Sequence, residues 1–553
     1  MKKFLALILA MLFPLALFCG CGQSENNNDN ENSTPPDNTE EQTPPEEQTL
    51  SDELKANLSA DGYVKGKISD FSVYEGTDAY RKVKTADELL EAIADAKYHY
   101  ENVWDDNTKT YTQVPEAGYT EENFEGKVHV IEIENDLNLG YYKLSNTRGL
   151  VNNFGTEKDD LSHSDMFKDN GISQIKVEKT SNLLIYSKNG AKLTHCGFKL
   201  TSDTNVVFRN LQFDEMWQWE DTYSNTTGGI GDYDAYGWAY FKISFCGYIW
   251  IDHCTFGKSY DGQIDISNPV YDANAGTASR APYGADGGNG VHISWCKFNS
   301  GSADKEGYLY KMMEKIEQSY KEDGTDYLYY NALRDAGASF EDILYGVAIP
   351  QKKGFLCGDG SNGEYDFNLK LQVSFANCKF TNLEDRIPKL RGGNAYMYNC
   401  VVDSLEYYGY RTTLRGMNVA SKVSAVNSSW KCALVSQGIV CGNGGSVMAE
   451  GCIFRGIDSL LKNNDKGNGT ANSADGGYKI ENCVYQKTEG KNTAIRSSST
   501  NLTANLFSWH TEDNQAPFTA IIHGTDNLEG VLSNADYGAG ITGSYLNLLK
   551  CTV

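Results

Sequence analysis

The sequence predicts an all-β fold: a right-handed, single-stranded parallel β-helix with an N-terminal capping helix and one helical insert. Short alternating segments recur along the chain, and each ends in a cysteine with an apolar residue two positions later, so both side chains point to one face of a strand. Where copies lie close, as from Cys378 to Cys400, Ser428 and Cys452, they are about 22 to 28 residues apart, within the roughly 20 to 50 typical of stacked solenoid repeats. The copies are IDHCTF (Cys254), ISWCKF (Cys296), FANCKF (Cys378), MYNCVV (Cys400), AEGCIF (Cys452) and IENCVY (Cys483).

Two further segments are interpreted as the same position filled by other residues: FRNLQF, with Leu211 and Phe213, and VNSSW, with Ser428 and Trp430. Helical periodicity is nearly absent between residues 125 and 500 outside the insert, and Gly and Asn are frequent at the turns, as expected for coils of strands. Equivalent residues then stack inside the solenoid. Stacked thiols would act as small apolar groups, with one or more disulfides as the alternative, because an exported chain with 14 cysteines permits them.

The N-terminus predicts export. Residues 1–20, within MKKFLALILAMLFPLALFCGCGQ, combine two lysines with an apolar run of signal-peptide length. The ending FCGC resembles a bacterial lipoprotein signal, with cleavage before Cys21 and lipid on that thiol; an ordinary signal peptide is the alternative. Residues 21–59 are too polar to pack and predict a disordered tether, so the folded domain is expected over 60–553. We therefore expect an extracytoplasmic protein, lipid-anchored to a bacterial membrane or cell surface, or secreted.

Two segments predict helices. Residues 81–97, RKVKTADELLEAIADAK, have Leu89, Leu90 and Ile93 at helical spacing after the capping-box pattern Thr85 to Glu88, and would close the N-terminal end of the solenoid. The second segment, about 302–350, is helical in pattern and rich in tyrosine. It is either a lid or cleft wall, or an insertion without function.

The charge balance restricts the ligands. Asp and Glu outnumber Lys and Arg by 74 to 49, giving a formal net charge of -25, which disfavours nucleic acid and anionic lipid. One stretch is an exception: EDRIPKLRGGNAYMYNC places Arg386, Lys389 and Arg391 within six residues. An anionic substrate would need such a local excess of cations.

Five stretches in order carry a resemblance to a known family: YIWIDHCTF, DGQIDIS, VHISWCKF, KKGFLCGDG and EDRIPKLRGGNAYMYN. From about Val83 to about Cys483 the chain resembles the pectate lyases of polysaccharide lyase family 1, most specifically in Arg-x-Pro-x-x-Arg-Gly-Gly and Trp-Ile-Asp-His. The resemblance implies cleavage of α-1,4-linked polygalacturonate, the homogalacturonan of plant cell walls, by β-elimination to unsaturated oligogalacturonides. We expect a monomer.

The resemblance also implies roles for the cations. Arg386 matches the general base that removes the C5 proton of a galacturonate, while Arg391 and Lys353 match residues that hold substrate carboxylates. The pKa of arginine ordinarily lies above about 12, so a basic arginine needs neighbouring cations, desolvation or alkaline conditions. Lys353, Lys389 and Arg391 could supply that cationic field.

Calcium is the cofactor that the resemblance implies, with Asp261 and Asp265 matching the acidic pair of the family. On an unbroken strand these residues would be about 13 Å apart, so they converge only if Gly262 allows a bend. Two further acidic positions of the family are Gly237 and Ala239 here, although Asp232 and Asp234 lie nearby. Calcium would then bind through fewer protein ligands, arrive with the substrate, or not be used.

Other conspicuous residues have plainer interpretations. Asp252 and His253 look like a catalytic pair, but we interpret them as structural, bonded within the coil. The aromatic stretch 215–238 either packs a loop or offers a platform for sugar rings; its members are Trp217, Trp219, Tyr223, Tyr233, Tyr236 and Trp238.

Two other functions stay open on sequence grounds. A calcium-independent pectin lyase acting on methyl-esterified pectin would suit Ala239, although Asp261 and Asp265 remain acidic. A non-catalytic polysaccharide-binding β-helix at the cell surface would also suit Ala239, whereas Arg386, Lys353 and Arg391 speak against it.

Overall fold

A computed structural model describes residues 58–155, 158, 165–219, 236–267, 278–284, 286, 288–358, 369–430, 432–463, 476–492, 507–511, 513–542 and 547–551. The signal peptide, Cys21 and the tether up to residue 57 lie outside these residues. Leu58 and Ala60, at the expected start of the folded domain, are buried. Within the described part of the chain, no helix is long and apolar enough to cross a membrane.

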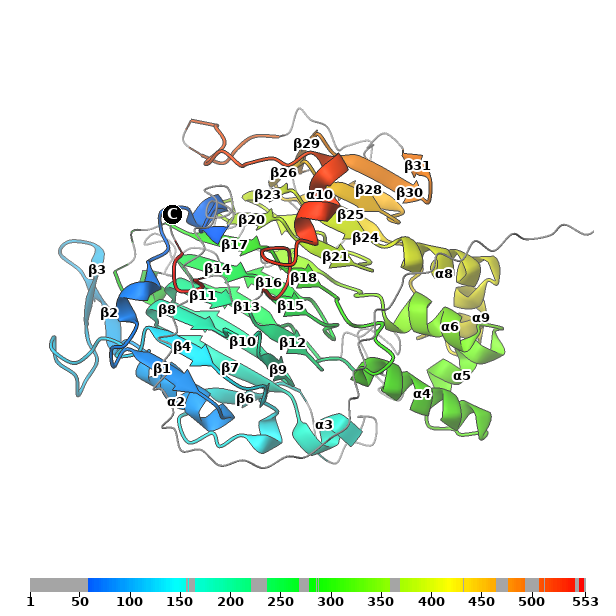
Figure 1. The fold of residues 1–553 in the computed structure, drawn as a ribbon, viewed down its shortest axis with the longest axis horizontal. Helices are drawn as coiled ribbons and strands as arrows, with labels where there is room; N and C mark the ends of the chain where they lie inside the picture. Colours follow the sequence, from blue (N-terminus) through cyan, green and yellow to red (C-terminus); the bar gives the residue numbers. More distant parts are fainter. Residues whose placement is uncertain are drawn as a thin grey trace, which may run out of the picture. The chain divides into compact units, whose positions relative to one another are not determined.

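Three sheets, each built from one strand per coil, form a right-handed parallel β-helix, as predicted (Figure 1). Sheet 1 contains β1 (Tyr80–Val83), β4 (Val130–Ile133), β8 (Ser181–Tyr186), β11 (Thr204–Arg209), β14 (Tyr248–Asp252), β17 (Gly290–Ser294), β20 (Gln372–Ala376), β23 (Asn394–Tyr398), β26 (Ser446–Glu450) and β29 (Gly477–Glu481).

The other two sheets follow the same order. Sheet 2 contains β6 (Val151–Asn153), β7 (Ser173–Glu178), β10 (Cys196–Thr201), β13 (Phe241–Ser244), β16 (Ile264–Ser267), β19 (Phe355–Cys357), β22 (Lys389–Arg391), β25 (Gln437–Gly442) and β28 (Ser459–Asn463). Sheet 3 contains β5 (Leu137–Asn138), β9 (Lys192–Thr194), β12 (Gln212–Asp214), β15 (Thr255–Phe256), β18 (Lys297–Phe298), β21 (Lys379–Thr381), β24 (Val401–Asp403), β27 (Ile453–Arg455), β30 (Val484–Thr488) and β31 (Lys491–Asn492).

The interior consists of stacked equivalent side chains. Phe213, Phe256, Phe298 and Phe380 stack on successive coils with ring centroids 4.7 to 5.1 Å apart. The predicted cysteine stack lies beside them, since the residues that follow each cysteine are paired from coil to coil. None of the twelve cysteines in the described residues is disulfide-bonded, which agrees with the interpretation of these thiols as small apolar groups.

One assignment of the repeat was wrong. Cys400 and Cys452 lie on consecutive coils, because the Cys400 N–H donates to the Cys452 sulfur at 3.4 Å. The chain between them forms α8 (Leu405–Gly416) and α9 (Val419–Val426) instead of a further coil. Ser428 and Trp430 therefore lie outside the stack, and the Trp430 ring contacts the Tyr329 ring at 5.9 Å.

The predicted capping helix is present as α2 (Ala86–Asp95), which has the expected capping box between Thr85 and Glu88 and buries Leu89, Leu90 and Ile93. It packs against β1 and β4, the first strands of sheet 1. The remaining short elements are η1 (Gly62–Val64), η2 (Phe71–Tyr74), η3 (Tyr141–Lys143), α3 (Asp165–Asn170), η5 (Ala278–Arg280), α10 (Thr525–Leu532) and the antiparallel hairpin of β2 (Tyr100–Asp105) and β3 (Thr110–Pro115).

The insert is helical, as predicted, with α4 (Tyr308–Lys321), α5 (Leu328–Asp335), α6 (Phe340–Ile343) and the π-helix η6 (Leu344–Ala348). It packs with α8 and α9, and Figure 1 shows these helices gathered beside the sheets. At its base, the buried Lys258 ammonium donates to the carbonyl oxygens of Ala348 and Pro350. The insert is thus fastened to the coil immediately before Lys353.

Asp252 and His253 belong to a buried network that joins both ends of the described chain. Asp252 accepts hydrogen bonds from Arg209 at 2.7 Å and from Ser294 at 2.6 Å, and lies 2.7 Å from His253 Nδ1. The same Arg209 guanidinium donates to the carbonyl oxygens of Leu58, Leu548 and Lys550. This arrangement agrees with the structural interpretation of Asp252 and His253.

Candidate active site

Three turns on neighbouring coils bring the predicted cations and carboxylates together at the entry to sheet 2. Asp261, Lys353 and Arg386 precede β16, β19 and β22, respectively. The Gly354 N–H donates to Asp385 O at 2.9 Å, and the Gly354 carbonyl accepts from Gln263 N at 2.7 Å. A Cβ at position 354 would lie 2.5 Å from Arg386 O, so this close approach of the turns requires glycine.

Arg386 has a left-handed backbone conformation, which recurs at turns of this solenoid. Its φ is +62°, in the left-handed region, where a residue other than glycine is strained. Two hydrogen bonds hold it there: its N–H donates to Asp385 Oδ1 at 2.7 Å, and its carbonyl accepts from Phe355 N at 2.7 Å. Within the described residues, the buried Nε of Arg386 has no hydrogen-bond partner. One donor of the guanidinium is therefore not engaged by the described part of the chain.

Lys353 forms an ion pair with one of the predicted metal-binding carboxylates. Its Nζ lies 2.9 Å from Asp261 Oδ1, and the two side chains are only 16% and 19% exposed. Sequence reasoning treated these residues as parts of two separate sites, one for substrate and one for metal. The structure joins them in one.

Asp261 and Asp265 converge through the predicted bend at Gly262. A Cβ on Gly262 would lie 2.8 Å from Asp265 Oδ1, so the absence of a side chain there admits that carboxylate. Burial raises the pKa of Asp261 to about 6, and the charge of Asp265 contributes to the rise. Burial also raises the pKa of Asp265, against the opposing charges of Lys242, Arg386 and Arg391. The buried Oδ1 of Asp265 has no hydrogen-bond partner among the described residues.

This acidic pair fits only part of a calcium site. Its two carboxylates are hard oxygen donors, but Ca²⁺ takes roughly 6 to 8 oxygen ligands. No group of three or more His, Cys, Asp or Glu residues in the described chain could hold a metal ion. Ala239 is buried, and Lys242 Nζ lies 3.1 Å from where a Cβ on Gly237 would be. Asp232 and Asp234 lie outside the described residues. The remaining ligands would have to come from water or from a bound anion.

Arg391 and Lys389 lie on β22, two strands from Asp265 of the acidic pair. Lys389 aligns with Leu356 and, through it, with Asp265. The Arg391 charge lowers the pKa of Asp265, which places the two side chains within electrostatic reach of each other. The field at Arg386 is accordingly mixed, because Asp261, Asp265 and Asp385 are close enough for Arg386 to lower the pKa of each. Acidic side chains therefore accompany the cations, Lys353, Lys389 and Arg391, that were predicted to surround Arg386.

The three tryptophans of the aromatic stretch pack inside the protein. Trp217 and Trp238 are fully buried and Trp219 is 2% exposed; the Trp219 ring stacks on Tyr329 of the insert at 5.7 Å. Tyr236 is half-buried and stacks on Trp238 at 5.0 Å. Tyr223 and Tyr233 lie outside the described residues. The tryptophans are therefore packing residues and not an exposed sugar platform.

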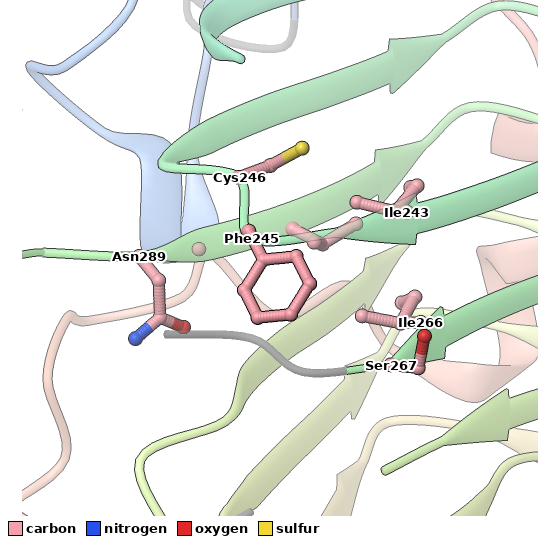
Figure 2. A pocket seen from close by; sticks show the side chains of 8 residues that line it. Ile243, Phe245, Cys246, Ile266, Ser267 and Asn289 are labelled. Atoms are coloured by element: carbon pink, nitrogen blue, oxygen red, sulfur yellow. The ribbon is translucent and has the colours of Figure 1, made fainter. Parts of the chain in front are cut away.

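A small hollow lies at the C-terminal ends of β13 and β16. Figure 2 shows Phe245 beside it, with Ile266 and Ser267 below and Asn289 to one side. Among the described residues no charged side chain lines it; the lining residues are Ile243, Phe245, Cys246, Ile266, Ser267, Asn289, Gly290 and Val291. This hollow offers no cation for a carboxylate, unlike the turns that carry Lys353 and Arg386.

Sequence reasoning missed three charged residues of this region. Glu384 and Asp385 precede Arg386, and burial raises the pKa of both, to about 7 for Glu384. Lys242 lies on β13, directly paired with Asp265. Glu384 and Asp385 lie within the conspicuous basic stretch, which was the available signal. Nothing in the sequence linked Lys242 to Asp265, because their pairing depends on the lengths of the intervening loops.

Comparison with known proteins supports the same interpretation, although no protein-family model matches the chain. Pectate lyase B of Paenibacillus amylolyticus is 28% identical over 392 residues, covering 70% of this chain and 91% of the relative. A pectate trisaccharide-lyase of Thermotoga maritima is 30% identical over 155 residues, covering 27% of this chain and 33% of that protein. The solved structure of a pectate lyase from Paenibacillus sp. 0602 superimposes with a TM-score of 0.69 and 26% identity, covering 90% of this chain and all of that one. In both sequence and fold, the chain is thus similar to bacterial pectate lyases.

Proposed function

We propose that this protein is a pectate lyase of polysaccharide lyase family 1, which cleaves α-1,4-linked polygalacturonate by β-elimination. One observation carries the proposal: Arg386, Lys353, Asp261 and Asp265 converge on neighbouring turns of a chain that is similar to pectate lyase B over most of its length. The substrate is the homogalacturonan of plant cell walls. It brings one carboxylate per sugar to a group of cations in an otherwise acidic protein.

In this proposal Arg386 acts as the base. It accepts the proton from C5 of a galacturonate, the C5–H electron pair becomes the C4–C5 double bond, and the bond from C4 to the glycosidic oxygen breaks. The released oxygen takes a proton, and the new non-reducing end is unsaturated. Because a guanidinium must first lose its own proton, turnover should rise with pH into the alkaline range.

Lys353 and Arg391 hold the substrate carboxylates. An ammonium has three N–H donors and a guanidinium has five, so Lys353 can keep its contact with Asp261 and still donate to a substrate oxygen. Arg391 can meet a carboxylate with two parallel hydrogen bonds. Substrate is thereby oriented with C5 towards Arg386.

Asp261 and Asp265 would hold calcium together with the substrate carboxylate. A bound calcium ion supplies Lewis acidity at the carboxylate next to C5, which makes the C5 proton easier to remove. Since the described chain offers only the two carboxylates, substrate oxygens would complete the ligand set. Calcium affinity should therefore be weak without substrate.

The test is a chelator-controlled assay of ultraviolet absorbance from the unsaturated product. With polygalacturonate and calcium, absorbance should rise, and faster at alkaline than at neutral pH; a chelator should abolish the rise. No product from polygalacturonate at any pH would overturn the proposal. Equal rates with and without chelator on methyl-esterified pectin would instead identify a calcium-independent pectin lyase.

We further propose that the protein acts as a monomer, anchored outside the cytoplasm through lipid on Cys21. The support for the anchor is the N-terminal sequence alone. The Cys21→Ser variant should move from the membrane fraction to the soluble fraction. An unchanged distribution would exclude the anchor.

A further inference from the structure

Outward-facing side chains of sheet 2 form a column that consists mainly of lysines. Neighbouring strands of a sheet lie about 4.8 Å apart, so residues in register stack at that spacing. From β7 to β28 the residues in register are Lys176, Lys199, Lys242, Asp265, Leu356, Lys389, Val440 and Lys462. We call this set the lysine column. It crosses the candidate active site at Asp265 and extends beyond it on both sides.

The lysines on β7, β10 and β13 occupy the same register position on three neighbouring strands, and their mutual repulsion lowers the stability of the fold. Like charges directly opposite each other on neighbouring strands are destabilising. In this acidic chain, lysines of sheet 1 and its flanks are neutralised, as when Lys82 pairs with Glu132 and Glu134. Within the described residues, neither Lys199 nor Lys242 has a carboxylate at ion-pairing distance, and Lys176 Nζ is bonded to the Gly149 carbonyl at 3.3 Å. Lys176 and Lys199 therefore leave positive charge at the surface that no carboxylate of the described chain pairs with at short range.

Lys242 links these lysines to the acidic pair. It is paired in register with Asp265, and its charge lowers the pKa of both Asp261 and Asp265. Its ammonium lies 5.1 Å from the centroid of the Phe154 ring. This cation–π contact over the ring holds the half-buried ammonium in place next to the acidic pair, where it can meet a carboxylate of the substrate.

We propose that Lys176, Lys199 and Lys242 form a binding track for additional uronate units of the substrate, on the N-terminal side of the acidic pair. The track is two strand spacings long, about 10 Å, and continues the lysine column away from Arg386. It rests on the proposed function, and it makes the enzyme selective for long polyanionic chains over short ones.

The length of the column gives this selectivity. Strand β10, with Lys199, lies four strand spacings, about 19 Å, from β22, which follows Arg386 directly. A trisaccharide engaged at Arg386 ends short of Lys199, whereas a polymer continues along the track. Lys176 and Lys199 therefore contribute to the binding of polymer only.

The test compares the double variant Lys176→Gln/Lys199→Gln with the wild type on polygalacturonate and on trigalacturonate. Each half-exposed contact between charges should change affinity about threefold, so KM for the polymer should rise about tenfold. The kcat values and the KM for trigalacturonate should stay unchanged. Lys192→Gln, on β9 of sheet 3, is the matched control and should alter neither substrate. Lys176→Arg/Lys199→Arg should restore the polymer KM, because it keeps both charges.

Salt gives a second measurement, because charge–charge attraction at an exposed surface is screened. The polymer KM of the wild type should rise more steeply with ionic strength than that of the double variant. An unchanged polymer KM in the double variant, or an equal rise for polymer and trisaccharide, would overturn the track.

Different results would contradict the proposed lyase activity and the proposed lysine track. A wild type that cleaves neither substrate would contradict the lyase, and the track would then be decided by calorimetric binding of polygalacturonate to the wild type and the double variant. Equal affinity of the two proteins for the polymer would contradict the track.

Discussion

The solenoid carries two columns of like residues, one inside and one outside, and the same coil-to-coil register builds both. Inside, Phe213, Phe256, Phe298 and Phe380 stack at 4.7 to 5.1 Å. Outside, the lysine column repeats along sheet 2. Stacked aromatic rings attract each other and exclude water, whereas stacked ammonium groups repel each other.

This difference separates residues that hold the fold from residues that serve a ligand. Repetition of an apolar residue lowers the free energy of the folded chain, so stability alone accounts for the interior stack. Repetition of a charge raises that free energy until an anion arrives. Asp261 and Asp265, whose charges repel each other, belong to the second kind.

The largest effect is expected at Arg386, and on activity alone. In Arg386→Lys, kcat should fall by up to about 10⁴-fold, the upper range for loss of a general base. The free energy of unfolding should hardly change, because Asp385 bonds the backbone N–H of residue 386 and not its side chain. Steady-state kinetics and denaturant unfolding measure the two quantities. Arg415→Lys, on α8, is the control and should keep full activity. Retention of more than a tenth of kcat in Arg386→Lys would exclude Arg386 as the base.

For the residues stacked inside the solenoid we expect the opposite: substitution should change stability and leave activity nearly unchanged. Phe298 is fully buried between Phe256 and Phe380 and contacts Phe355 edge-on at 4.8 Å. Phe298→Ala should lower the free energy of unfolding by about 3 to 5 kcal/mol, while kcat of the protein that remains folded stays close to that of the wild type. Urea unfolding, together with kinetics at low temperature, tests both. A loss below 1 kcal/mol would show that the interior stack is not what stabilises the coils.

Glu384 lies in the turn between β21 and β22. Its titration makes the stability of the fold depend on pH. Burial raises its pKa from the ordinary 4.5 to about 7, so the folded state binds the proton more tightly than the unfolded state does. The free energy of unfolding should therefore fall as pH rises from about 4.5 to about 7, by up to about 3 kcal/mol. Glu384→Gln should remove this fall and be more stable than the wild type at pH 8, with little difference at pH 4.

Thermal unfolding at the two pH values checks this expectation. Glu314→Gln, on the exposed face of α4, is the matched control and should change neither value. A wild type and a Glu384→Gln variant that show the same stability difference at pH 4 and pH 8 would contradict the assignment.

The smallest effect is expected in the lysine column. Lys199→Gln relieves repulsion from Lys176 and Lys242, so the free energy of unfolding should rise by a few tenths of a kcal/mol, within about 1. Differential scanning calorimetry at low ionic strength would detect it, and added salt should erase the difference. A clear destabilisation would mean that Lys199 stabilises the fold, and the lysine column would then not differ from the interior stack in this respect.

Much of this protein could be read from its sequence, because its determinants are local. Period-two alternation, with a cysteine and an apolar residue two positions later, identified the coils, and the Thr85 to Glu88 pattern identified the capping helix. The stretch 384–400 placed Arg386, Lys389 and Arg391 together, since residues within one turn cannot separate. The family resemblance then supplied the chemistry that these residue types suit.

Only the tertiary structure decided which coils are neighbours. Cys400 and Cys452 pair across two helices, so Ser428 and Trp430 were misassigned. The Lys353–Asp261 ion pair and the register of Lys242 with Asp265 each join residues separated by a loop of unpredictable length. In a solenoid, side-chain type is set along the strand, but contacts form across coils. Loop lengths fix the register between coils, and local sequence patterns do not encode it.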